Sequence, residues 1–285
     1  MVIVDGGSGD GTWELLTDWS TRVSKLKVYR VPGANNPQGR NEAIKRTKAD
    51  IIVTFDSGTQ YSSDWLALML KPFEEQTISV VSGLTICHGE TFFEKCVAAF
   101  GDLKRASFWP SHRGIAFRRE VWETVGGYPE HVSAGEDTWF DSQFAKLGYK
   151  HVNVPDAKNY WKVRSNWQAL FKMQKRNIKG HVSLSESIGI IGPIVTLVVH
   201  VILVICAIAG IFDRRLWFAG AAMYMFYVLA RLLLRGRWRI FTNPLKFLVG
   251  FYALTAYDCG TLLGIIEGAP VLLQQIMRGR KDKKL

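Results

Sequence analysis

The chain is poor in cysteine and carries no closely spaced cysteine pair. Its four cysteines, Cys87, Cys96, Cys206 and Cys259, form no C-x-x-C motif, and two of them lie in apolar runs. Disulfide frameworks and structural zinc sites both need paired cysteines at short spacing, so we expect neither here. The chain also lacks the G-x-G-x-x-G fingerprint and the P-loop lysine, which argues against the commonest dinucleotide and triphosphate sites.

Acidic residues are outnumbered, with 25 Asp and Glu against 36 Lys and Arg, which gives a net charge of +11. Such a surplus first suggests nucleic acid. The basic residues are not gathered into one patch with interleaved aromatics, however. They flank apolar runs, within residues 172–179, 235–239 and 278–284. Because basic residues beside apolar spans are typical of cytoplasmic, anionic-lipid-facing surface, we expect a membrane partner and no nucleic acid.

Charge is almost absent from three long runs after about residue 185. Residues 188–212 have no Asp, Glu, Lys or Arg, and residues 216–234 and 245–266 follow with few. Each run is long enough to span a bilayer. An ionisable residue within a span usually has a pairing or functional role, so we expect Asp258 to pair with Arg231. His200, in the first run, is expected to be a packed histidine rather than a ligand.

These patterns divide the chain into four predicted parts. Residues 1–164 form an α/β catalytic domain, and residues 165–184 form a basic amphipathic helix in the headgroup layer. Residues 185–277 form membrane-spanning helices, and residues 278–285 form a basic tail. Three full spans would place this tail opposite the arginine-rich loop at residues 235–239. We therefore expect residues 245–277 to turn back through the membrane or to lie partly in it.

Strands and helices alternate over the first 85 residues or so, which predicts a parallel α/β sheet. The apolar run 51–55 is the clearest strand, and it ends in Asp56, Ser57 and Gly58. Ligands of open α/β sheets bind beyond the carboxyl ends of strands. Asp56 is therefore a candidate for contact with a metal or a phosphate-bearing ligand. The alternative is an acid that caps the following helix.

A glycine-rich acidic turn, residues 5–12, follows the first strand. Its four glycines allow a ligand to approach the backbone closely. A turn with this much aspartate suits a base, a ribose or a metal-bound ligand better than bare phosphate. The alternative is an ordinary tight turn with a capping side chain.

Five segments occur in the order found in family 2 glycosyltransferases with the GT-A fold, which the chain resembles over about residues 2–180. The segments are residues 4–12, 39–44, 49–56, 114–120 together with 125–128, and 135–138. The resemblance implies a Rossmann-like, mostly parallel sheet that binds a nucleotide sugar. It also implies an enzyme that inverts the configuration at the transferred sugar.

The resemblance also implies roles for particular residues. Asp5 would read the nucleotide base, and Asp56 would lie beside the diphosphate and its divalent cation, Mg²⁺ or Mn²⁺. Asp137, next to Glu136, would be the general base. The remaining residues implied in nucleotide-sugar binding are Ser8, Asp10, Arg40 and Asn41. The alternative for Glu136 and Asp137 is an acidic first helical turn that offsets the helix dipole.

Two departures from the family pattern bear on activity. The family's Asp-x-Asp is reduced to Asp56 alone, so a cation would be held by Asp56, diphosphate and water, or by another residue such as His181. The family also begins with one more strand and helix, whereas this chain starts inside the second strand. Truncation, a mis-assigned start or a protein without donor binding would each explain that difference.

The predicted function is that of an integral membrane glycosyltransferase with a cytoplasmic catalytic domain. It would move sugar from a UDP- or GDP-sugar to a lipid-linked acceptor, such as polyprenyl phosphate or a glycan. Gln174 and Arg176 are the expected contacts at the membrane surface. Two alternatives are a polysaccharide synthase, disfavoured because no Q-x-x-R-W motif follows, and a non-catalytic membrane subunit.

Overall fold

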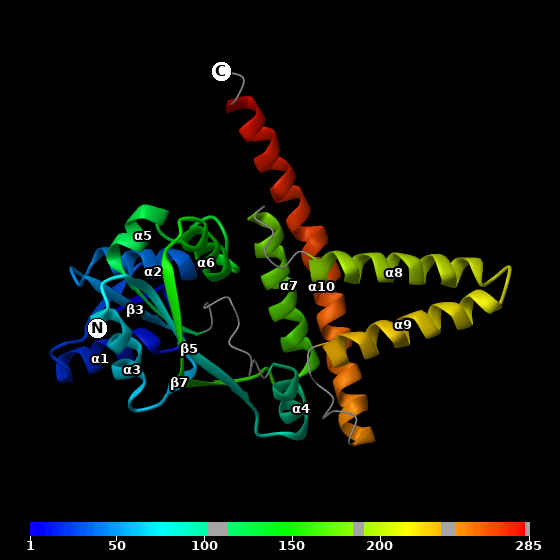
Figure 1. The fold of residues 1–285 in the computed structure, drawn as a ribbon, viewed down its shortest axis with the longest axis horizontal. Coiled ribbons are helices and arrows are strands. Elements are labelled where there is room, and N and C mark those ends of the chain that lie inside the picture. Colours follow the sequence, from blue (N-terminus) through cyan, green and yellow to red (C-terminus); the bar gives the residue numbers. More distant parts are fainter. Residues whose placement is uncertain (102–112, 185–190, 235–242, 283–285) are drawn as a thin grey trace. The chain divides into compact units, whose positions relative to one another are not determined.

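A computed structural model describes residues 1–101, 113–184, 191–234 and 243–282. Its contacts divide the chain into two compact units (Figure 1). The first unit comprises residues 1–86 and 103–161, and the second comprises residues 87–102 and 162–285. Each unit is described by itself below. The arginine-rich loop at 235–239 and residues 283–285 of the basic tail lie outside the described ranges.

The first unit contains a two-stranded and a five-stranded sheet. β1 (Val2–Asp5) and β2 (Lys27–Arg30) form the small parallel sheet. The large sheet has the order β3-β6-β5-β7-β4. Its strands are β3 (Ile51–Phe55), β4 (Thr59–Tyr61), β5 (Ile78–His88), β6 (Gly114–Arg118) and β7 (Lys150–Lys162). The strand predicted at residues 51–55 is therefore confirmed, and Asp56 follows it directly.

The expectation of a mostly parallel sheet is wrong for the strand pairs around Asp56. β3 and β6 run antiparallel, as do β5 and β6, and β4 and β7. The reason is topological, because β6 enters the sheet between β3 and β5 from a distant part of the chain. Alternation of local elements reveals that strands are present, but it does not reveal which distant strand is inserted between them.

Helices pack on the sheets around an apolar core. They are α1 (Thr12–Arg22), α2 (Asn36–Lys45), α3 (Trp65–Leu70), the 3₁₀ helix η1 (Lys71–Glu74), α5 (Arg119–Val125) and α6 (Glu136–Lys146). Phe117 of β6 and Phe140 of α6 are fully buried at the centre of one cluster, with ring centroids 5.2 Å apart. This packing fixes α6, and with it Glu136 and Asp137, against the strand next to β3.

The start of α2 is set by local hydrogen bonds. The Asn35 side chain accepts from the Gln38 backbone N–H, and the Gln38 side chain accepts from the Asn35 backbone N–H. This reciprocal capping box satisfies two backbone donors that a helix end leaves unpaired. Pro37 stands in the first turn, where its missing N–H costs nothing. The helix is thereby started at a defined residue, which determines where Arg40 points.

The second unit is helical. Its helices are α4 (Phe92–Gly101), α7 (Trp167–Ser183), α8 (Ile191–Ala209), α9 (Arg215–Leu234) and α10 (Pro244–Asp282). Three segments are long and apolar enough to cross a membrane, namely Ile191–Ala209, Arg215–Leu233 and Pro244–Gln274. They coincide with the three apolar runs of the sequence. α7 occupies the place of the predicted amphipathic helix.

The predicted pair of Asp258 and Arg231 is confirmed. Asp258 is 1% exposed, and the Arg231 Nη1 donates to its Oδ1. The same Arg231 nitrogen donates to the Tyr227 hydroxyl over 2.7 Å. His200 packs against the ring of Tyr227, and its Nε2 lies 4.0 Å from Asp258 Oδ2. A buried carboxylate is thus paired and hydrogen-bonded, as burial of charge requires.

α7 and α10 pack closely because three glycines recur every fourth residue along α10. Cβ atoms added at Gly260, Gly264 and Gly268 would each come within 3.0 Å of α7 atoms. At Gly264 the contacts would be Ile178 Cβ at 2.7 Å and the Lys175 carbonyl oxygen at 2.8 Å. Small residues at this spacing let helix backbones approach closely.

We predict that Gly264→Val separates α7 from α10, because the added atoms meet the Lys175 carbonyl and the branched β-carbon of Ile178, neither of which is the far end of a flexible side chain. Overpacking of this kind costs about 1–3 kcal/mol. The melting temperature of the detergent-solubilised variant should therefore be lower than that of the parent chain. The matched control is Gly192→Val in α8, where an added Cβ meets nothing within 4 Å. Equal melting temperatures of the two variants would contradict the packing described.

Candidate functional site

The pairing of β3 with β6 brings Asp56 beside Arg113. Phe55 is opposite Gly114 in the register, so the next pair beyond the strand ends is Asp56 and Arg113. The Asp56 N–H lies 3.3 Å from the Arg113 carbonyl oxygen and 3.0 Å from the Tyr61 hydroxyl. The Tyr61 hydroxyl in turn donates to the Arg113 carbonyl oxygen. Burial raises the pKa of Tyr61 to about 12, which keeps this hydroxyl protonated.

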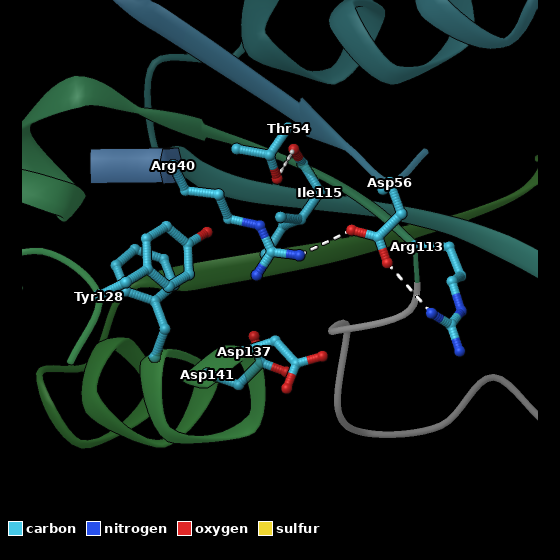
Figure 2. Close-up of a pocket in the computed structure, with 10 residues that line it drawn as sticks. Arg40, Thr54, Asp56, Arg113, Ile115, Tyr128, Asp137 and Asp141 are labelled. Atoms are coloured by element: carbon cyan, nitrogen blue, oxygen red, sulfur yellow. Dashed lines mark hydrogen bonds and ion pairs between the residues drawn. The ribbon is translucent and has the colours of Figure 1, made fainter. Parts of the chain in front are cut away.

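The Asp56 carboxylate is held between two guanidinium groups (Figure 2). Its Oδ1 lies 2.7 Å from Arg40 Nη2, and its Oδ2 lies 3.1 Å from Arg113 Nη1. The Arg113 guanidinium also stacks over the Trp161 ring, 4.1 Å from the centroid. Charge-assisted hydrogen bonds and cation–π contact together fix the position of both groups. The end of β3 therefore presents two cations and one anion.

Arg40 also reaches the start of α6. Its Nη1 lies 2.8 Å from Glu136 Oε1, while its Nη2 contacts Asp56. Glu136 is only 4% exposed. Burial raises the pKa of Glu136, and the neighbouring Asp137 raises it further, whereas Arg40 acts in the opposite direction. Burial alone would lower the pKa of Arg40, but its anionic neighbours more than reverse this and raise it. Arg40 thus bridges the strand end and the acidic helix start.

A small pocket that is open to solvent lies at this point. Its lining residues are Arg40, Thr54, Asp56, Arg113, Gly114, Ile115, Tyr128, Asp137, Phe140 and Asp141. Figure 2 shows Asp137 across the pocket from Arg40 and Asp56. Asp137 Oδ1 accepts from the Thr138 backbone N–H over 2.7 Å, which orients the carboxylate. The structure therefore brings Asp56 and Asp137, 81 positions apart in the sequence, to one pocket.

The acidic turn is held by its own aspartate. Both Asp5 oxygens accept from the Ser8 N–H, Oδ2 also accepts from the Gly7 N–H, and Arg30 Nε lies 3.5 Å away. The Ser8 side-chain hydrogen bond is the main cause that lowers the pKa of Asp5. Asp10 accepts from the Thr12 N–H and hydroxyl. None of Asp5, Ser8 and Asp10 lines the pocket. Their contact with a nucleotide base stays a prediction.

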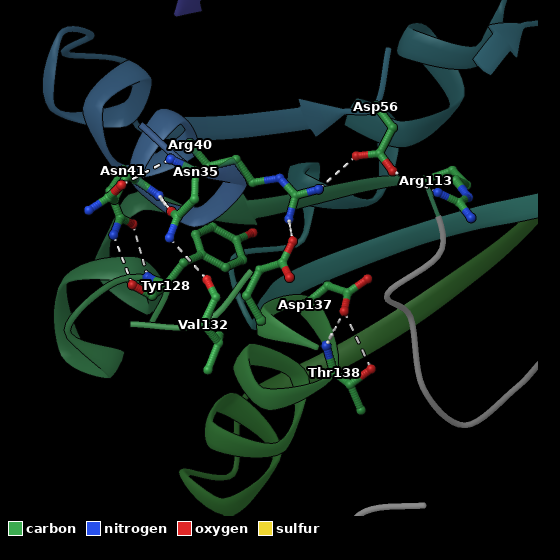
Figure 3. Close-up of polar contacts among 11 residues, drawn as sticks. Asn35, Arg40, Asn41, Asp56, Arg113, Tyr128, Val132, Asp137 and Thr138 are labelled. Atoms are coloured by element: carbon green, nitrogen blue, oxygen red, sulfur yellow. Dashed lines mark hydrogen bonds and ion pairs between the residues drawn. The ribbon is translucent and has the colours of Figure 1, made fainter. Parts of the chain in front are cut away.

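Asn41 has its amide engaged within the protein (Figure 3). Its Nδ2 donates to the Tyr128 carbonyl and to Glu130 Oε1, each over 2.8 Å. Its Oδ1 accepts from Trp122 Nε1 and from the Tyr128 N–H. Asn41 is 4% exposed and thus positions the Tyr128 segment from within. Its predicted contact with the donor stays untested and would require these bonds to be released.

The residues around Asp56 do not form a ready-made metal cage. Within the described ranges no three His, Cys, Asp or Glu side chains are grouped so as to hold a metal ion. Both Asp56 oxygens contact arginine. Mg²⁺ is commonly held by one or two carboxylates plus substrate phosphates and water. The chain therefore fits a cation that arrives with a diphosphate. His181, the alternative ligand, lies in α7 of the second unit.

Sequence reasoning missed Arg113 and Trp161. Arg113 directly precedes the strand at residues 114–118, and recognising this strand as the partner of residues 51–55 would have found it. No local signal marks Trp161. The predicted surface residues Gln174 and Arg176 lie on α7, where Gln174 Nε2 donates to Thr261 Oγ1 over 3.1 Å and Arg176 is exposed.

We predict that Asp5→Asn destabilises the first unit at neutral pH but not at low pH. The folded-state pKa of Asp5 is depressed, so its stabilising contribution is present above the ordinary value of 3.8 and is lost as pH falls through the folded pKa. The two melting temperatures should therefore converge below about pH 3.8. Asp64→Asn, at an exposed helix start without a side-chain cap, is the control. A constant difference between Asp5→Asn and the parent at every pH would contradict this role.

Curated relatives share modest identity with this chain. O-antigen chain rhamnosyltransferase RfbN of Salmonella typhimurium is 23% identical over 176 residues, which cover 55% of this chain and 55% of that protein. Glycosyltransferase AglE of Haloferax volcanii is 25% identical over 197 residues, covering 65% and 63%. Succinoglycan biosynthesis protein ExoA of Rhizobium meliloti is 27% identical over 165 residues, covering 53% and 50%. The chain thus spans about half to two thirds of the length of these proteins.

A solved structure shares the fold. Mannosyltransferase PcManGT from Pyrobaculum calidifontis, in complex with GDP-Man and Mn²⁺, superposes with a TM-score of 0.54 at 18% identity, covering 94% of this chain and 77% of that one. The GT-A fold expected from the sequence is therefore confirmed. The sequence profile described as glycosyl transferase family 2 matches residues 1–139. Residues 1–139 of this chain, just under half of its 285 residues, therefore match glycosyl transferase family 2.

Proposed function

We propose that the chain is a membrane-bound, inverting glycosyltransferase that moves a sugar from a nucleotide-sugar donor to a lipid-linked acceptor. The observation that carries the proposal is the pocket in which Asp137 faces Asp56 and its two arginines. One side of the pocket suits an anionic leaving group, and the other offers a carboxylate for proton removal. Transfer of a sugar from a diphosphate to a hydroxyl needs both.

Arg40 and Arg113 are suited to the donor diphosphate. Planar guanidinium groups recognise phosphate oxygens through paired N–H donors. Both groups now contact Asp56, so an entering diphosphate would compete with this carboxylate for the same N–H groups. Fixed cations at the leaving group stabilise the charge that develops as the glycosidic bond breaks.

Asp56 would hold a divalent cation if a diphosphate replaced it as the partner of one of the two arginines. Asp56 would supply the single protein carboxylate, and when bound the cation would add positive charge at the leaving diphosphate. The Mn²⁺ in the mannosyltransferase structure supports this assignment. Asp56 thus has two roles, as the anchor of the arginines without donor and as the oxygen ligand with it.

Asp137 is placed to act as the general base. The Thr138 N–H holds one of its oxygens, and Phe140 forms an apolar wall of the same pocket. Asp137 would take the proton of the acceptor hydroxyl while that oxygen bonds to the anomeric carbon. The bond from this carbon to the diphosphate breaks at the same time, and the nucleoside diphosphate leaves with the electron pair. A single displacement of this kind inverts the anomeric carbon.

The second unit supports an acceptor at the bilayer. Its three long apolar helices would hold the protein at the membrane, where polyprenyl phosphates and glycolipids are found. The names of the relatives, O-antigen and succinoglycan biosynthesis among them, are consistent with lipid-linked or glycan acceptors. The succinoglycan relative also keeps polysaccharide extension as the second candidate, although the chain lacks Q-x-x-R-W.

We predict that Asp137→Asn lowers kcat by about 10²- to 10⁴-fold, the range for loss of a general base. The donor dissociation constant should hardly change, because the carboxylate faces the acceptor. Radiolabelled transfer from UDP- and GDP-sugars to membrane extract, with calorimetry of donor binding, measures both quantities. Asp64→Asn is the control. Undiminished transfer by Asp137→Asn, or no binding of either donor by the parent chain, would overturn the proposal.

We predict that Arg113→Gln weakens donor binding by about 10- to 100-fold, since a hydrogen bond to a charged group is worth about 1.5–3 kcal/mol. Arg113→Lys should keep only part of the parent chain's affinity for the donor, because lysine lacks the planar, forked arrangement of N–H donors of a guanidinium group. Arg22→Gln, which removes an exposed arginine on α1, is the control. Calorimetric titration with a nucleoside diphosphate measures the effect. Unaltered affinity in Arg113→Gln would show that Arg113 serves only to hold Asp56.

A further inference from the structure

Within the described residues, the hairpin of α8 and α9 contacts α10 near the base of the hairpin. Near its base, Tyr227, Val228 and Leu232 pack with Leu254 of α10, and Arg231 pairs with Asp258. Toward the tip the described contacts are within the hairpin, for example between Cys206 and Gly220. Figure 1 shows the hairpin leaving α10 on the side away from α7. α8 and α9 therefore project away from α10 rather than run along it.

The hairpin has the dimensions and surface of a two-span membrane element. α8 has 19 residues, which is about 28 Å of helix and close to the roughly 30 Å hydrocarbon core. Exposed aliphatic side chains such as Val201 and Ile205 cover it, and the tip carries the exposed residues Asp213, Arg214 and Arg215. This charged tip suits the far side of a bilayer.

α10 carries an exposed apolar stripe that is too long for a span. The stripe runs from Leu245 to Met277 through Tyr252, Leu263, Ile266 and Leu273, all at least 40% exposed. These positions recur at helical spacing on one face, and the stripe extends over 32 residues, about 48 Å. A crossing helix would leave a third of it outside the hydrocarbon. A helix lying along the surface would bury all of it.

The charges of α7 also argue against α10 as a span. Gly260, Gly264 and Gly268 contact α7 directly, so this part of α7 shares the depth of α10. The same turns of α7 expose Lys172, Arg176 and Lys179. Basic side chains are costly at the bilayer centre but favourable among anionic headgroups. The pair of helices is therefore compatible with the headgroup layer and poorly compatible with the hydrocarbon core.

We propose that α10 lies in the membrane surface with its apolar stripe in the acyl chains, and that α8 and α9 are the chain's two crossings among residues 191–282. The partner of this surface is a lipid bilayer containing anionic headgroups, with α7 held along α10 on the aqueous side. The buried pair of Asp258 and Arg231 fixes the hairpin to α10 at the point where it enters the bilayer. Two crossings place the basic end of α10 on the same side of the bilayer as α7, which precedes them in the chain. This inference does not rest on the proposed catalytic activity.

The arrangement is tested by measuring the membrane depth of spin labels on the full chain. The chain is placed in nanodiscs in which one lipid in four is anionic. Each chain carries one cysteine for labelling. In the first, Cys87, Cys96 and Cys206 are replaced and Cys259 remains. In the others, all four native cysteines are replaced and one of Leu245→Cys, Ile266→Cys and Leu273→Cys is added. Val201→Cys, exposed near the middle of α8, is the depth standard. Collision of the nitroxide with oxygen and with a nickel chelate reports depth. We expect the three stripe labels at one shallow depth and Val201→Cys near the bilayer centre.

Two results would overturn the proposal. Labels whose depth passes from one surface through the centre to the other would make α10 a span. Labels shielded from both oxygen and nickel would show that protein, either the first unit or a second copy, covers the stripe. A fluorescent protein fused after Leu285 gives an independent test in the native sequence. Fluorescence on the cytoplasmic side is expected, and an external terminus would likewise reject the arrangement.

Discussion

The two ion pairs of Arg40 are the interaction on which the pocket depends. One guanidinium joins Asp56 at the end of β3 to Glu136 at the start of α6, over 2.7 and 2.8 Å. The bridge sets the spacing between the strand that would meet the diphosphate and the helix that carries Asp137. Glu136 is buried, and a buried acid without a partner would be costly, so Arg40 is a condition for bringing the start of α6 close to Asp56.

Several buried contacts hold the bridge in place. The capping box at Asn35 fixes the start of α2, and Asn41, one residue after Arg40, ties this helix to the Tyr128 segment. The Tyr128 ring stacks on Phe140 of α6, with centroids 4.5 Å apart. The Asp56 carboxylate is oriented by two arginines, and in the proposed function a diphosphate would compete for them. In the proposed function, the same groups would stabilise the pocket without donor and recognise the diphosphate when the donor binds.

The parts that were predictable from sequence are those encoded locally. Short stretches of sequence are enough to recognise the strand ending in Asp56, the acidic helix start at Asp137 and the apolar runs. The charges of Asp258 and Arg231 could be paired because an apolar run offers few other partners. What failed was non-local. The antiparallel pairing of β6 with β3 joins residues some 60 positions apart, so it could not be recognised from a short stretch of sequence. Arg113 was missed for the same reason, because it reaches Asp56 only through this pairing. Asn41 matched a family motif but is satisfied internally, which only side-chain packing reveals.

In the proposed function, one physical requirement connects the membrane helices with the pocket, because a water-soluble donor and a lipid-bound acceptor would have to meet there. The central claim is that the arginines beside Asp56 hold the donor's diphosphate opposite Asp137. A cryo-electron microscopy structure of the full chain in nanodiscs with a nucleoside diphosphate and Mn²⁺ tests it most directly. The account predicts phosphate density between Arg40 and Arg113, with Asp56 turned toward the cation. Nucleotide density elsewhere, with both Asp56 ion pairs intact, would contradict it.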